Sequence, residues 1–120
     1  YMTDAWVEER GVQNLAIYDC FPKFLHLSLK GSGDTMPATI RKMSGAVADR
    51  FCIGQRGYIK KGFFADLTVF DEEKLKKGVP DQNKPFGIEK VFVNGTKVLD
   101  GETLDRQAFA KAGRAMPRER

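Results

Sequence analysis

The chain has 120 residues, a formal net charge of +4 and 42% hydrophobic side chains, which fits one domain's worth of sequence with a modest core. No apolar run approaches the roughly 20 residues that a membrane-spanning helix needs, and no signal peptide is evident, so we expect no membrane partner and a cytoplasmic location. The excess positive charge lies near the C-terminus without interleaved aromatic residues, which favours a solvated basic tail over a nucleic-acid site.

The N-terminal part predicts the end of a strand, a polar connection and a helix. Residues 1–6 lack an initiator methionine and a capping signal, and they resemble the end of a strand that begins upstream. Glu8–Tyr18 is expected to be a polar connection, followed by a helix over Phe21–Lys30 with Pro22 in its first turn. The apolar residues of that helix recur at helical spacing: Phe21, Phe24, Leu25 and Leu29. The single histidine, His26, is expected on its amphipathic surface without a catalytic role, because a zinc site needs about three or four ligands.

A second helix is predicted after the break at residues 31–34. Thr35 is its expected cap, and Pro37 is tolerated in its first turn. One face carries apolar residues at steps of three and four, which we interpret as core: Met36, Ile40, Met43 and Val47. Gly45 is expected to loosen this helix, after which Ala46–Phe51 adds a short helical segment that Gly54 ends.

A turn and a strand are predicted next. Gly57 and Gly62 supply the backbone angles of a tight turn, with Lys60-Lys61 as a solvated corner between them. Leu67–Phe70 is rich in β-branched and aromatic side chains, which predicts a buried strand. Residues 72–85 are charged and interrupted by proline and glycine, so we expect an exposed loop with one helical turn.

The last third predicts a hairpin and a short helix. Asn94-Gly95 is a typical two-residue hairpin turn, and it separates the predicted strands Ile88–Val93 and Thr96–Leu99. Leu104–Gly113 is expected to form a short helix, and residues 116–120 are expected to fray.

The two cysteines, Cys20 and Cys52, show no spacing typical of a disulfide framework or a metal knuckle. We therefore interpret them as two free thiols of a protein from a reducing compartment.

Taken together, several segments resemble the C-terminal part of an amidohydrolase, and in particular the N-acyl-D-amino-acid deacylases. In that family a helix, a short segment, a glycine-rich turn with its strand and a hairpin follow in this order and at about this spacing. The segments that carry the resemblance are Ile40-Arg41-Lys42-Met43, Ala48-Asp49-Arg50-Phe51, Arg56-Gly57-Tyr58-Ile59, Gly62–Asp71 and Val91–Leu99.

The resemblance implies an α+β fragment. Residues 1–55 would be the end of the metal-dependent hydrolase barrel, with the last strand and helices of a (β/α)8 barrel. Residues 56–101 would supply strands of a small β-sandwich, and residues 102–120 a C-terminal helix and tail. Because a remnant of three strands leaves open edges and an uncovered apolar face, we expect the chain to self-associate.

The resemblance also implies one catalytic residue, Asp4. The last barrel strand of the family ends in a catalytic aspartate, and Thr3-Asp4-Ala5 fits that pattern. Asp4 would be the base that takes a proton from the metal-bound water and passes it to the leaving amine. On the tripeptide alone, an exposed aspartate near a frayed terminus is the alternative. Farther on, Lys23 stands where the family usually has an arginine, a departure that bears on the substrate.

The implied function is that of a piece of a hydrolase that cleaves the linear, non-peptide amide of N-acyl-D-amino acids. The intact enzyme would use a divalent metal, usually zinc, held by residues upstream, so we expect no metal and no activity in these 120 residues alone. Two alternatives stay open: a cyclic-amide hydrolase of the dihydroorotase or hydantoinase kind, which shares the segment Gly62–Asp71, and a stand-alone interaction module without catalysis.

Overall fold

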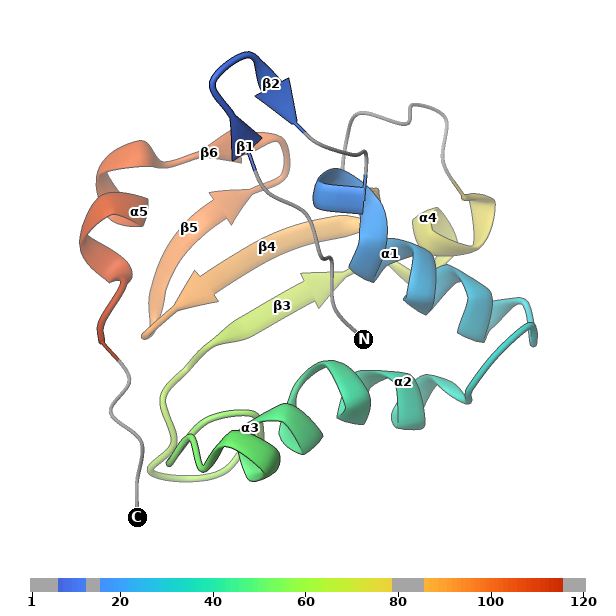
Figure 1. Cartoon of the computed structure of the whole chain (residues 1–120), viewed down its shortest axis with the longest axis horizontal. Coiled ribbons are helices and arrows are strands. Elements are labelled where there is room, and N and C mark those ends of the chain that lie inside the picture. Colours follow the sequence, from blue (N-terminus) through green and yellow to red (C-terminus); the bar gives the residue numbers. More distant parts are fainter. Residues whose placement is uncertain (1–6, 13–15, 79–85, 116–120) are drawn as a thin grey trace. The chain divides into compact units, whose positions relative to one another are not determined.

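A computed structural model describes residues 7–12, 16–78 and 86–115 of the chain. The chain divides into two compact units, Tyr1–Met43 with Asp71–Gly87, and Ser44–Phe70 with Ile88–Arg120. Figure 1 shows the elements of both, and each unit is described by itself.

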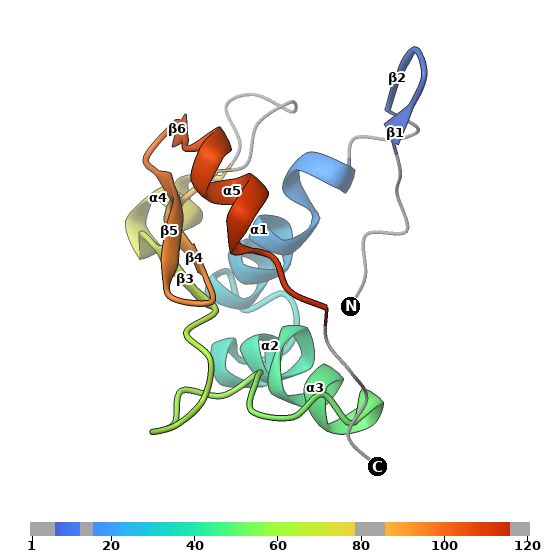
Figure 2. The ribbon, with the colours of Figure 1, turned by 90° about the vertical axis from the view of Figure 1, so that its left-hand side faces the viewer.

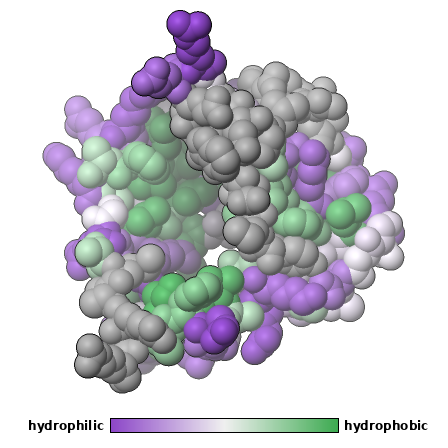
Figure 3. All heavy atoms as spheres, in the orientation of Figure 1, coloured by the Kyte–Doolittle hydropathy of each residue, from purple (hydrophilic) through white to green (hydrophobic). Residues whose placement is uncertain are grey.

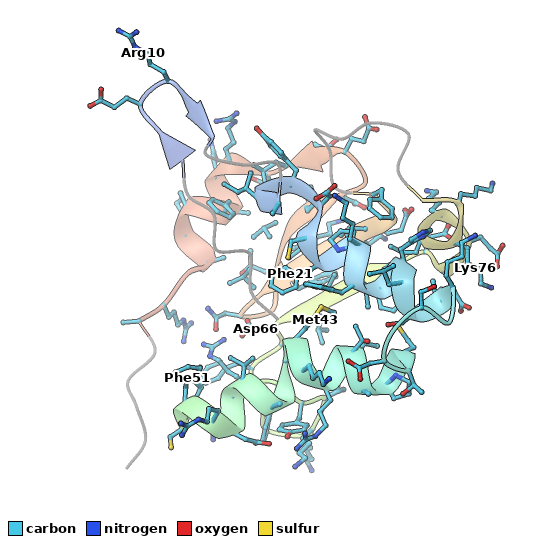
Figure 4. All side chains as sticks on the ribbon, turned by 45° about the vertical axis from the view of Figure 1, so that its right-hand side comes forward. Arg10, Phe21, Met43, Phe51, Asp66 and Lys76 are labelled. Carbon is cyan, nitrogen blue, oxygen red and sulfur yellow. The ribbon has the colours of Figure 1, made fainter. Side chains whose placement is uncertain are left out.

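The first unit is helical and begins with a small hairpin. β1 (Val7–Glu8) pairs antiparallel with β2 (Gly11–Val12), and Arg10 points away from the hairpin tip (Figure 4). Three helices follow in this unit: α1 (Ala16–Leu29), α2 (Met36–Met43) and α4 (Glu72–Lys77). α1 packs against both α2 and α4.

Polar side chains join α1 to its two neighbours. The hydroxyls of Ser28 and Thr39 lie 2.6 Å apart, and Thr39 is buried between α1 and α2. His26 donates from Nδ1 to the carbonyl oxygen of Leu75 on α4 over 2.6 Å, and Leu75 is completely buried. The His26 ring also meets the edge of the Phe86 ring at 6.2 Å between centroids. His26 therefore ties α1 to α4, in place of the surface position that its amphipathic helix predicts.

The start of α1 differs from the prediction. The helix begins at Ala16 rather than at Phe21, so Pro22 lies inside it and not in its first turn. Proline signals a helix start because it lacks an N–H and disfavours the helix interior. Here the buried face of α1 runs through the proline, as Asp19, Pro22 and Leu25 recur every third residue, and this packing stabilises the helix across it.

The second unit combines a four-stranded antiparallel sheet with two helices. The strands lie in the order β3 (Leu67–Phe70), β4 (Ile88–Val93), β5 (Thr96–Asp100) and β6 (Thr103–Leu104). α5 (Arg106–Ala112) packs on β5, as the edge-on view of the sheet in Figure 2 shows. Val98 of β5 and Ala112 of α5 are buried, and hydrophobic residues gather over β4 and β5 in Figure 3.

The predicted β-hairpin is confirmed. β4 and β5 are joined by Asn94 and Gly95, whose φ angles are +50° and +81°, as a two-residue turn requires. The short helix near the C-terminus is confirmed as α5. The fourth strand, β6, was not predicted; it returns through Gly101 (φ +56°) to pair with the end of β5.

Two further predictions need correction. β3 forms where the sequence predicts a buried strand, but Leu67 and Val69 are 37% and 45% exposed, and the strand lies at the edge of the sheet. α3 (Gly45–Phe51) follows the break after α2 as predicted, but it ends before Gly54. Cys52 takes the left-handed conformation there (φ +53°), and backbone bonds to the carbonyls of Ala48 and Asp49 close the helix.

Among the described residues, no helix is long and apolar enough to cross a membrane. The predictions for residues 1–6 and 116–120 concern positions outside the described residues.

Candidate functional site

The predicted catalytic residue, Asp4, lies outside the described residues, as does the whole of Thr3-Asp4-Ala5. Two ion pairs of the described residues include a largely buried side chain, one in each unit. One is built from the motif residues around β3 and the hairpin, and the other lies on α1.

The first group is a network centred on Asp66, which Figure 4 shows at the beginning of β3. Arg56 pairs with Asp66 through Nη1 and donates from Nη2 to the side-chain oxygen of Asn94 over 2.6 Å. The backbone N–H of Asn94 donates to the other oxygen of Asp66 over 2.8 Å. The Asn94 amide also donates to the carbonyl of Ala112 over 2.5 Å, which fixes the end of α5 to the hairpin turn.

Stacking and backbone bonds complete this network. The guanidinium of Arg56 lies 4.2 Å from the ring centroid of Phe64, and only 11% of the Arg56 side chain is exposed. The N–H of Gly95 donates to the carbonyl of Ala65 over 2.9 Å, so the turn is held on two sides. Because both oxygens of Asp66 are occupied, its carboxylate is a structural acceptor and not a free base.

The glycines of the same motif allow close packing. Gly57 has a φ of +81°, and a Cβ there would lie 2.7 Å from the Cβ of Ala48. Gly45 faces the ring of Tyr58, whose hydroxyl donates to Asp49 over 2.5 Å. The motif residues around Arg56 thus specify a folded turn and hairpin, and they do not form a catalytic pair.

The second group lies in the first half of α1. Asp19 is completely buried, and neither of its carboxylate oxygens accepts a hydrogen bond. Lys23, one helical turn later, brings its Nζ within 2.9 Å of Oδ2, and the lysine side chain is 53% exposed. The two groups form an ion pair, but their geometry is not that of a hydrogen bond.

The cysteines are free, as predicted, and neither forms part of a metal cluster in the described part of the chain. Burial raises the pKa of the Cys20 thiol, and the adjacent charge of Asp19 raises it further. Cys20 is therefore held as a thiol at neutral pH, which makes it a poor nucleophile and a poor metal ligand.

The residues of the described ranges do not fit a metal centre, because no group of three or more histidine, cysteine, aspartate or glutamate side chains could hold an ion there. His26 contributes its ring to the α1–α4 packing instead. We therefore derive no catalytic step through a metal from these residues.

Sequence reasoning missed the buried polar residues. Thr39 and Asp19 are the buried polar side chains of the described part of the chain, and both lie at helix positions where apolar residues are expected. The sequence contains a hydrogen-bonding partner for Thr39, the hydroxyl of Ser28 on the preceding helix. Only the packing of the two helices brings the two hydroxyls together. No local pattern marks Asp19.

No family model matches the chain. A D-aminoacylase of Alcaligenes xylosoxydans xylosoxydans is 30% identical over 106 residues, which cover 85% of this chain and 21% of the relative. An N-acyl-D-aspartate deacylase of the same organism is 35% identical over 72 residues, which cover 57% of this chain and 14% of the relative.

Solved structures give the same result. A D-aminoacylase that defines a novel subset of amidohydrolases has a TM-score of 0.76 at 28% identity, covering 88% of this chain and 22% of that protein. A D-aminoacylase described for its binuclear metal centre matches with the same TM-score of 0.76. The chain thus spans about a fifth of the length of the relatives that it matches. The resemblance to the N-acyl-D-amino-acid deacylases that the motifs indicate is confirmed.

Proposed function

We propose that this chain is the C-terminal part of a metal-dependent amidohydrolase that cleaves the linear amide of N-acyl-D-amino acids. The observation that carries the proposal is the agreement with D-aminoacylase, in sequence over 85% of the chain and in structure over 88% of it. The network of Arg56, Asp66 and Asn94 supports it, because these residues belong to segments that resemble the deacylases.

The reaction adds water across the amide. The carbonyl carbon gains an oxygen and the C–N bond breaks, which gives a carboxylate and a free D-amino acid. Asp4 is the residue that we propose as general base: its carboxylate would accept a proton from the attacking water and deliver it to the leaving nitrogen. That role follows from its position in Thr3-Asp4-Ala5.

A metal ion, for which we expect zinc, would polarise the amide carbonyl in the parent protein. One similar D-aminoacylase structure concerns a binuclear metal centre, and another is a D-aminoacylase mutant in complex with copper chloride. Both support metal binding by the parent protein. Its ligands would come from residues beyond those described here, so we propose that the 120 residues by themselves bind no zinc and are inactive.

We further propose the division at residues 55 and 101 into a barrel end, a sandwich part and a C-terminal helix with its tail. Leu67 and Val69 on the edge strand are exposed, which supports self-association of the isolated chain. Light scattering over a range of concentrations tests this directly, and a monomer at every concentration would contradict it.

Hydrolysis of matched substrates tests the proposed function. The full-length reading frame should be expressed and assayed with N-acetyl-D-leucine, N-acetyl-L-leucine, dihydroorotate and hydantoin. We expect turnover of the D-enantiomer, which an Asp4→Asn variant loses. Turnover of a cyclic amide alone would support the dihydroorotase-like alternative, and a start codon close to Tyr1 with no turnover would support the interaction module.

A further inference from the structure

The segment Arg56-Gly57-Tyr58-Ile59 carries part of the family resemblance, and the structure gives its first three residues a structural role. Arg56 pairs with an aspartate and stacks on an aromatic ring, Gly57 packs closely on α3, and the Tyr58 hydroxyl donates to a carboxylate of the same helix. Ile59 is different, because it is an aliphatic side chain that is 90% exposed. The packing of the second unit therefore leaves one residue of the segment unexplained.

Ile59 is held in this exposed position by contacts on both sides of it. The hydroxyl bond of the preceding tyrosine ties the chain to α3. After Ile59, the N–H of Phe63 donates to the carbonyl of Lys60 over 3.1 Å. The N–H of Phe64 donates to the carbonyl of Gln55 over 2.9 Å, which joins the two ends of the loop. An apolar side chain on a loop of fixed conformation loses little conformational entropy on binding, and this is the property of an interface anchor.

The two residues that follow Ile59 are basic and exposed, Lys60 and Lys61. The ammonium of Lys60 lies 4.9 Å from the ring centroid of Tyr58 and 5.5 Å from that of Phe63. A surface that covers Ile59 would therefore meet positive charge beside the aliphatic side chain. The complementary surface is an apolar pocket bordered by carboxylates.

We propose that Ile59 anchors the second unit to the part of the parent protein that lies outside this chain, in an apolar pocket bordered by carboxylates. The inference rests on the proposed function, in which the chain is one part of a longer enzyme. The chain spans about a fifth of the length of the D-aminoacylases that it matches, so a parent of that size has several times as much polypeptide available to cover the loop. Burial in such a pocket removes apolar surface from water and favours the assembled protein.

Alkylation of a cysteine at this position tests the inference. The full-length protein with Ile59→Cys is treated with N-ethylmaleimide, and modification of the peptide that contains residue 59 is followed by mass spectrometry, in native buffer and in urea. We expect the native rate to be about tenfold or more below the rate in urea. The 120-residue chain with the same substitution should react within about twofold of its rate in urea, because position 59 is exposed there.

Glu102→Cys is the matched control. Glu102 is an exposed residue of the same unit, in the turn between β5 and β6, and its variant should react at nearly the urea rate in both proteins. Should thermal unfolding show that Ile59→Cys does not fold, Lys61→Cys repeats the measurement at the border of the pocket, with an expected protection of about threefold or more. Lys61→Glu, added to Ile59→Cys, should raise the native rate about threefold, because like charges repel. An unchanged rate overturns the carboxylate border.

Equal native and urea rates for Ile59→Cys in the full-length protein overturn the inference. Equal protection in the 120-residue chain also overturns it, and so does protection that is lost on dilution, because the cover would then come from this chain or from a second copy. Turnover of N-acetyl-D-leucine by the wild-type protein is measured separately. Turnover with an unprotected position 59 overturns the inference alone, whereas protection without turnover of any N-acyl-D-amino acid contradicts the proposed function alone.

Discussion

Two ion pairs, one in each unit, show different ways of partnering a charge: Asp66 is partly exposed, whereas Asp19 is buried. Arg56 and Asp66 are surrounded by donors and acceptors, so that each side chain makes several bonds. Asp19 and Lys23 make one ionic contact, although Asp19 is the more deeply buried acid. A buried charge stabilises a fold only when its hydrogen bonds are satisfied, so the first pair supports the structure and the second does not.

The residues that carry the family resemblance are not the residues of the unsatisfied ion pair on α1. The segments through which the chain resembles the deacylases contain the network of the second unit, and that network fixes a turn and a hairpin. The unsatisfied pair on α1 lies in a part of the chain where the resemblance is weaker, at a residue that departs from the family pattern. The residues of the second unit that carry the family resemblance therefore have a structural role.

The largest expected effect is that of replacing Arg56. Arg56→Met removes the guanidinium that Asp66 and the Asn94 side chain share, and it leaves Asp66 with the backbone N–H of Asn94 as its donor. We expect the free energy of unfolding to fall by about 2 to 3 kcal/mol, measured by urea titration. Arg56→Lys should recover only part of the loss, because an ammonium cannot donate to both partners in the same fork. An unchanged midpoint for Arg56→Met would mean that the network is not a source of stability.

A smaller effect is expected at the glycine that follows. Gly57→Ala meets both a positive φ and the side chain of Ala48, whereas Gly62→Ala meets only a positive φ (+86°), with nothing within 4 Å of the added Cβ. We expect losses of about 2 kcal/mol for Gly57→Ala and about 1 kcal/mol for Gly62→Ala. The difference between the two, from the same urea titrations, measures the close approach to Ala48. Equal losses would show that α3 moves aside without cost.

The predicted and observed structures agree where local backbone angles decide the structure, and they differ where packing decides it. The hairpin at Asn94-Gly95 could be predicted, because both residues must take positive φ and few residue pairs do so readily. The early start of α1 could not, since Pro22 is a strong local signal that packing overrides. The exposure of β3 was missed because its composition is that of a buried strand, and composition does not reveal whether a covering layer is present.

The candidate site was predictable only in part. Asp4 was found through its motif and remains a prediction, whereas Asp19 has no motif, and its burial depends on how α1 packs. Local sequence gives the type of a side chain, but an unsatisfied buried charge can be recognised only once its surroundings are known.

The pair on α1 should respond to replacement in the opposite direction from the network. Exchange of both residues, Asp19→Leu with Lys23→Met, removes a buried charge that lacks hydrogen bonds and lets apolar side chains take its place. We expect the free energy of unfolding to rise by about 1 kcal/mol. Urea titration of the double variant beside the wild type measures this. A loss of stability would mean that the pair is structural and would weaken the contrast with Arg56.

The smallest expected effect concerns a third kind of charge, an exposed carboxylate at a helix end. Asp71 caps α4, and its Oδ1 accepts hydrogen bonds from the backbone N–H groups of Glu73 (2.9 Å) and Lys74 (3.0 Å). The bond from Lys74 contributes most to lowering the pKa of Asp71 below its ordinary value. Because the folded state binds this proton less tightly than the unfolded state, the contribution of Asp71 to stability is present above the unfolded pKa, about pH 4.

That contribution should be lost as the pH falls through the lowered pKa of the folded state. The carboxyl carbon of Asp71, followed by NMR between about pH 2 and pH 6, should titrate below the ordinary range of an aspartate. Asp71→Asn keeps a capping oxygen but does not titrate, so its α4 should show no loss from this group on acidification. A titration of Asp71 at or above the ordinary value would show that the cap does not form in solution.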